Sequence, residues 1–328
     1  MVMSAETAPS MAELTSDPDK IQYLSSSHFI VSEVNRLLLE QRSEVLELES
    51  QEENINMHRV DAYREKIGAP KKEIRVLSDD DYEKAIEIAK QSKQELTDEH
   101  GQWLPLEDLI IVKRGENSAV SNELTESFLV HEIAHSSSAY SLIHIKEEVS
   151  PRLLRKDKVH YRPNIARAGF ATVKKEEYVS GIFLEEGYAE YERGQYIANE
   201  LNRPYGFYEN VTMQSTDVPD ASIALKYFYP PNPSTPEAIG HPKGATAAII
   251  LELLVSKDPK LLDSMRHSRS SVEGLRDVAA RIDKLVPGLY DRLRKIDTTS
   301  SSFNNESWKL VGEVHRAINA TKDRLETA

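Results

Sequence analysis

Residues 128 to 135 read Phe-Leu-Val-His-Glu-Ile-Ala-His and contain the pattern H-E-x-x-H, formed by His131, Glu132 and His135. Residues four apart in an α-helix lie on one face, a single turn from each other. Two imidazoles at this spacing can bind one metal ion, and Zn²⁺ is the usual choice for neutral nitrogen ligands. The pattern therefore predicts a helix that carries two metal ligands.

Glu132 projects about 100° around this helix from His131, so it flanks the metal instead of binding it. A carboxylate in that place can act as the general base that takes a proton from metal-bound water. The expected helix also has an apolar face, formed by Leu129, Val130, Ile133 and Ala134. We therefore expect the helix to be buried, as a metal site requires.

A second informative stretch, residues 183 to 192, reads Phe-Leu-Glu-Glu-Gly-Tyr-Ala-Glu-Tyr-Glu. Together with H-E-x-x-H, it resembles the gluzincin metallopeptidases, in which a glutamate on a second helix completes the zinc site. The segment from Leu184 to Ala189 looks like their Asn-Glu-Gly-x-Ala motif, with Glu185 where Asn usually stands. The resemblance makes Glu186 the third ligand.

The spacing of the carboxylates supports Glu186 independently. Glu190 lies one turn after Glu186, where it can accept the free N–H of a ligating histidine. Glu185 has only Ala189 at the same offset. Gly187 lowers helix stability by about 1 kcal/mol relative to Ala, so we expect another helix to approach closely at this position.

The resemblance covers roughly residues 105 to 200 and implies a zinc-dependent peptidase that acts on peptides or proteins. Residues 136 to 185 separate His135 from Glu186, a longer connection than in aminopeptidase-type members. The chain also lacks the Gly-x-Met-x-Asn segment with which those members bind a free amino terminus. An endopeptidase or a short-peptide hydrolase is therefore favoured.

Composition excludes other kinds of site and partner. The 328 residues contain no cysteine, so disulfides and thiolate ligands are impossible and a metal must be held by His and carboxylate. The formal charge of −13 argues against nucleic acids and anionic membranes as partners. The acidic N-terminal segment lacks the features of a signal peptide, and no segment is apolar enough to span a bilayer, so a cytoplasmic protein is expected.

The order of the patterns predicts an α+β, zincin-like fold with a small N-terminal mixed sheet, a metal-site helix and a mostly helical C-terminal lobe. We expect a disordered tail at 1–19, a helical arm at 20–70, a catalytic core at 71–200, and a lobe at 201–328 with a Pro-rich cleft loop. Strands are expected at 74–77 and 109–112, a hairpin from 166–173 and 178–180, and helices at 78–90, 121–135, 246–255, 261–265, 272–285, 289–296 and 308–318. A polar linker is expected at 297–307.

Several polar side chains in the expected loops are secondary candidates for contacts with substrate or an oxyanion, although a structural role is expected for each one alone. They are His160, Tyr161, Arg167, Tyr227, Tyr229 and His241. Two alternatives to a peptidase stay open. One is a non-catalytic zincin-fold protein that binds a peptide or protein partner, and an intact Glu132 argues against it. The other is a chance motif in a helical scaffold, which predicts no metal at all.

Overall fold

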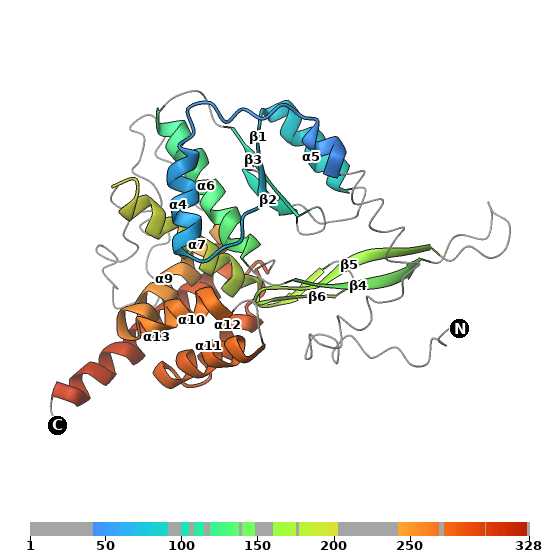
Figure 1. Cartoon of the computed structure of the whole chain (residues 1–328). Coiled ribbons are helices and arrows are strands. Elements are labelled where there is room, and N and C mark those ends of the chain that lie inside the picture. Colours follow the sequence, from blue (N-terminus) through green and yellow to red (C-terminus); the bar gives the residue numbers. More distant parts are fainter. Residues whose placement is uncertain are drawn as a thin grey trace.

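The protein is described by a computed structural model, which covers residues 42–90, 100–104, 108–114, 119–137, 140–147, 160–174, 177–202, 242–268, 272–298 and 300–326. These residues form a mixed α+β fold that is mostly helical (Figure 1). Two central helices lie between a small mixed sheet, a longer antiparallel sheet and a group of C-terminal helices. The α+β class and the small mixed sheet expected from the sequence are confirmed.

The mixed sheet has three strands in the order β1-β3-β2, namely β1 (Glu73–Leu77), β3 (Leu109–Lys113) and β2 (Gly101–Leu104). β1 runs parallel to β3 and β2 runs antiparallel to it. Helix α5 (Asp79–Lys90) connects β1 to the rest of the sheet, and the Asp81 N–H donates to the Ser78 hydroxyl at its start. The sequence predicted β1, β3 and α5 but not β2, because four residues that include a glycine give too short a pattern to identify.

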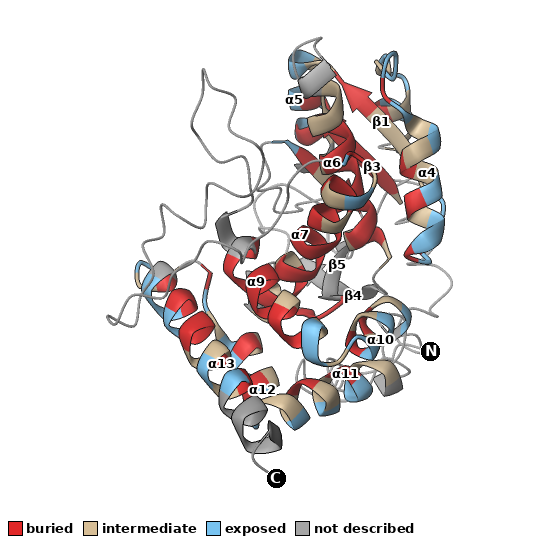
Figure 2. Cartoon of the chain, turned by 90° about the vertical axis from the view of Figure 1, so that its left-hand side faces the viewer, coloured by how far each residue is buried: buried red, intermediate tan, exposed pale blue. Residues whose placement is uncertain are grey.

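The two central helices are α6 (Ala119–Ser136) and α7 (Ile182–Asn199), which pack against each other. The face of α6 formed by Leu129, Val130, Ile133 and Ala134 is almost fully buried, as expected. Helix α7 is buried nearly all round, as Figure 2 shows. Such burial around a whole helix is typical of the centre of a core.

Helix α4 (Met57–Lys66) packs against α6, and Val60 and Tyr63 bury their side chains there. The continuous helical arm expected from residue 20 is wrong for residues 49–56, which are not helical. In this segment the Gln51 N–H donates to the Val76 carbonyl, and the Ser50 hydroxyl accepts from the Val76 N–H. The chain follows the edge of β1 there, which an apolar helical pattern could not indicate. Residues 1–41 lie outside the described part.

The second sheet is antiparallel and has the order β4-β5-β6-β7. Its strands are β4 (Tyr140–Glu147), β5 (His160–Ala168), β6 (Ala171–Lys174) and β7 (Glu177–Ser180). The expected hairpin around residues 174–177 is present as β6 and β7. Residues 166–173 do not form one strand, because the chain reverses at Gly169, whose φ of 55° lies in the left-handed region.

After α7, the described residues form five more helices, namely α9 (Pro242–Lys257), α10 (Lys260–Ser268), α11 (Val272–Leu285), α12 (Leu289–Lys295) and α13 (Phe303–Glu326). The sequence located all five, but it placed the start of α13 too late. Phe303 is buried and packs edge-on against Phe183 of α7, at 5.9 Å between ring centroids. This contact fixes the start of α13 within a stretch whose polar composition indicates a linker. No helix among the described residues is long and apolar enough to cross a bilayer.

Candidate metal centre

His131, His135 and Glu186 bring three possible ligand atoms to one point between α6 and α7. The two Nε2 atoms are 3.1 Å apart, and Glu186 Oε2 lies 3.5 Å from that of His131 and 3.6 Å from that of His135. Zinc–ligand distances of about 2.0–2.1 Å in a tetrahedral shell put neighbouring ligand atoms roughly 3.3 Å apart. The triangle therefore has the size that a single zinc ion needs.

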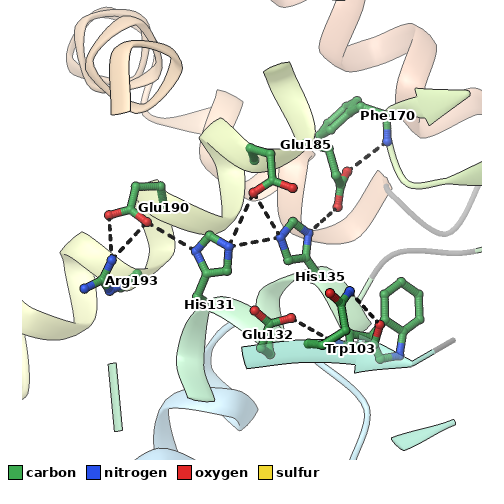
Figure 3. A network of polar contacts seen from close by, with 10 residues as sticks. Trp103, His131, Glu132, His135, Phe170, Glu185, Glu190 and Arg193 are labelled. Carbon is green, nitrogen blue, oxygen red and sulfur yellow. Dashed lines mark hydrogen bonds and ion pairs between the residues drawn. The ribbon is translucent and has the colours of Figure 1, made fainter. Parts of the chain in front are cut away.

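Glu190 orients the His131 ring through its Nδ1 atom, which lies 3.3 Å from Glu190 Oε2 (Figure 3). Arg193, one turn further along α7, donates through Nη1 to both Glu190 oxygens at 3.1 and 3.3 Å. Its Nε donates to the Ser127 hydroxyl on α6 at 3.1 Å. Glu190 and Arg193 are both fully buried, and their contact fixes the carboxylate beside the imidazole. An acceptor at Nδ1 selects the tautomer that points the Nε2 lone pair at the metal position.

His135 has an equivalent support on the other side of the site. Glu185 Oε1 lies 3.2 Å from His135 Nδ1, and its Oε2 accepts the Phe170 backbone N–H at 2.9 Å. Phe170 belongs to the turn between β5 and β6, so the second sheet helps to hold this ligand (Figure 3). No role for Glu185 was expected from the sequence, because its neighbour one turn on, Ala189, is not a carboxylate. Glu185 is polar and stands where the gluzincin motif carries Asn, and this position could have indicated its role.

The surrounding carboxylates change how both histidines titrate. Burial lowers the pKa of His131, but hydrogen bonds with Glu186 and Glu190 outweigh it and raise the pKa to about 9. Burial also lowers the pKa of His135, and the charge of Glu186 and the hydrogen bond with Glu185 raise it well above its ordinary value. A site that attracts protons this strongly will attract a divalent cation, with which the protons compete.

Glu132 is not one of the three ligand residues, and its carboxylate contacts strand β2. Its Oε2 accepts the Trp103 backbone N–H at 2.7 Å, and its side chain is buried. β2 stands at one end of the described sheet, and this N–H is directed to Glu132 instead of the neighbouring strand β3. The carboxylate is thus anchored through one oxygen, next to the edge of β2.

Close packing of α7 against α9 positions Glu186. An ideal Cβ at Gly187 would lie 2.3 Å from the Cβ of Ala247, and one at Gly244 would lie 2.7 Å from the Glu186 carbonyl oxygen. The two glycines therefore allow contact between the helices that any side chain would prevent. The close approach expected at Gly187 is confirmed.

Two further buried carboxylates tie the central helices to α4 and α10. Glu126 on α6 accepts from Arg59 at 2.6 Å and from the Tyr196 hydroxyl at 2.7 Å. Burial raises the pKa of Tyr196, and the hydrogen bond with Glu126 raises it further. Glu192 on α7 accepts from Arg266 through both oxygens, at 2.7 and 2.8 Å. Both carboxylates are buried and paired with arginines, so these contacts stabilise the arrangement of the ligand helices.

The side chains of the secondary candidates all lie outside the described part of the chain. His160, Tyr161 and Arg167 lie on β5, but their side chains are outside the described part of the chain. Tyr227, Tyr229 and His241 belong to residues 203–241, which are also outside it.

Comparison of the chain with family models, with curated proteins and with solved structures finds no match in any of the three. Its function must therefore be inferred from the arrangement of its own side chains.

Proposed function

We propose that this protein is a zinc-dependent peptidase of the gluzincin type, with His131, His135 and Glu186 as zinc ligands. The observation that carries the proposal is the combination of a zinc-sized triangle of donor atoms with a buried carboxylate, Glu132, that is not one of the donors. A site that served only to bind metal or a peptide has no need of such a base. The donor set of two neutral nitrogens and one carboxylate oxygen also suits zinc.

When bound, zinc supplies a Lewis acid that polarises a carbonyl and lowers the pKa of a coordinated water toward 7. The chain supplies the remaining groups. Glu132 accepts the proton of the attacking water and can then deliver it to the leaving amine. Glu185 and Glu190 hold the imidazoles in the tautomer that leaves Nε2 free to bind.

The substrate class follows from strand β2, which stands beside Glu132 at one end of the described sheet. An extended peptide can pair with such an edge through its backbone, with modest demands on its side chains. A peptide amide held there would lie next to the base. We therefore propose extended peptides as substrates.

The test compares wild-type protein with Glu132→Gln, which keeps the shape of the side chain and removes its basicity. General-base assistance is commonly worth about 10²- to 10⁴-fold, or roughly 3–5 kcal/mol of barrier. The variant should keep its zinc content and its fold while it loses cleavage of a quenched peptide pool by at least this factor. Equal cleavage by the two proteins would exclude Glu132 as the base. Zinc and peptide binding without cleavage by either would favour the non-catalytic binding protein.

A further inference from the structure

Gly101 of β2 lies directly against the side chain of the proposed base, Glu132. An ideal Cβ built on it would lie 3.1 Å from Glu132 Cγ and 3.3 Å from Glu132 Oε1. It would also lie 3.2 Å from Cγ2 of Val112, the residue that pairs with Gly101 across β2 and β3. Distances this short occur only when a neighbour gives way by a few tenths of an ångström. Glycine therefore leaves the space that the Glu132 side chain fills.

The two oxygens of Glu132 have different surroundings. Oε2 accepts the Trp103 N–H at 2.7 Å, which fixes the carboxylate against the strand. Oε1 is the oxygen next to the bare backbone of Gly101. The backbone of β2 thus anchors Oε2 at Trp103 and leaves room for Oε1 at Gly101, two residues earlier.

We propose that Gly101 is a positioning residue for Glu132: its missing side chain lets the carboxylate lie against β2, anchored by Trp103 with Oε1 directed to the reacting water. This inference rests on the proposed peptidase function. A methyl group at residue 101 must move the carboxylate, because the β2 backbone is held by its pairing with β3 and the Cβ leaves residue 101 at a fixed angle.

The first variant is Gly101→Ala. Misplacement by about 1 Å can cost on the order of 10²-fold in rate, so a shift of a few tenths of an ångström should lower kcat by about 10-fold. We expect KM and zinc content to stay within about twofold of wild type, because neither the ligands nor the peptide contacts of β2 change. In a Glu132→Gln background the same substitution should have no further effect, since no base remains to be positioned.

A matched control separates displacement of Glu132 from simple crowding within the sheet. Val112→Ala removes the other atom that the new methyl group meets, and Val112 is a core residue that is neither a proposed ligand nor the proposed base. Gly101→Ala/Val112→Ala should therefore keep the low kcat of Gly101→Ala. Recovery of kcat in the double variant would overturn the inference, because crowding against Val112 would then be the cause.

A second readout does not depend on turnover. An amide proton that donates to a carboxylate resonates downfield, so the Trp103 amide reports the anchoring of Glu132 in the metal-free protein. In Gly101→Ala this resonance should move upfield, toward its position in Glu132→Ala. The positioning role is refuted if the Trp103 resonance does not move in Gly101→Ala. It is also refuted if Gly101→Ala keeps the wild-type kcat while Glu132→Gln is inactive. Either result leaves the peptidase proposal intact. Absence of cleavage by wild type refutes the peptidase proposal, and the Trp103 resonance then decides the inference alone.

Discussion

The contact between Gly187 and Ala247 predicts that an ordinarily stabilising substitution will destabilise this protein. Gly→Ala in a helix interior usually contributes about 1 kcal/mol of stability, because alanine has the higher helix propensity. At Gly187 the new Cβ would lie 2.3 Å from the Ala247 Cβ. Carbon atoms pack at about 3.5–4.0 Å, so α7 and α9 would have to separate by roughly 1.2 Å or more.

The magnitude follows from two opposing contributions. Overpacking of a close-packed core typically costs about 1–3 kcal/mol, and occasionally more. Subtracting the helix-propensity gain of about 1 kcal/mol leaves a net loss of up to about 2 kcal/mol, with the opposite sign to Gly→Ala at an exposed helical position. Because Glu186 directly precedes Gly187, the movement of α7 should also spread the ligand triangle and weaken zinc binding, on the order of 10-fold.

Urea unfolding of the metal-free Gly187→Ala protein measures the first effect, and competition with a chelator measures the second. Gly187→Ala/Ala247→Gly is the matched control, since it removes the atom in closest contact. This double variant should recover part of the lost stability, although the Ala247 backbone remains within 3.1–3.2 Å of the new Cβ. A Gly187→Ala protein more stable than wild type would refute the packing described between α7 and α9.

Two further predictions concern the support and titration of the ligands. Glu190→Ala and Glu185→Ala should each weaken zinc binding by about 10- to 100-fold, and the matching Gln variants less, because Gln keeps an acceptor for the histidine Nδ1–H; equal affinity in an Ala variant and wild type would remove that carboxylate from the site. In metal-free protein, His131 has a pKa raised to about 9, so its charged form contributes stability that is fully present below about pH 6.5 and lost as pH rises through about 9. Zinc affinity should rise over the same interval, because zinc displaces these protons. Measuring the free energy of unfolding and the zinc affinity at about pH 6.5 and about pH 9 checks both pH dependences. Both should be weaker in Glu190→Gln. A free energy of unfolding that rises with pH over this interval would contradict the raised pKa.

The parts of the site that depend on one helix could be predicted from the sequence. The spacing of His131 and His135 is set by helical geometry, and Glu190 lies one turn from Glu186, which the gluzincin resemblance indicated as the third ligand. The contacts of Glu185 with Phe170 and of Glu132 with Trp103 depend on how separate elements pack, which local spacing does not encode.

The fold, too, could be predicted from the sequence only in part. Apolar periodicity located β1, β3 and the main helices, because each carries enough buried residues to produce a pattern. β2 is too short to give one, and β4 and most of β5 fell in residues 136–165, to which no strand was assigned. Phe303 begins α13 through a tertiary contact with Phe183 inside a polar segment. Packing between elements overrides local composition at these places.

Metal analysis of purified protein tests the central claim most directly, with wild type compared with Glu186→Ala. We predict close to one zinc per wild-type chain and loss of most metal affinity in Glu186→Ala, because two histidines alone leave the triangle open. Wild-type protein that holds no zinc after exposure to it, or a Glu186→Ala variant that binds zinc as tightly as wild type, would contradict the account.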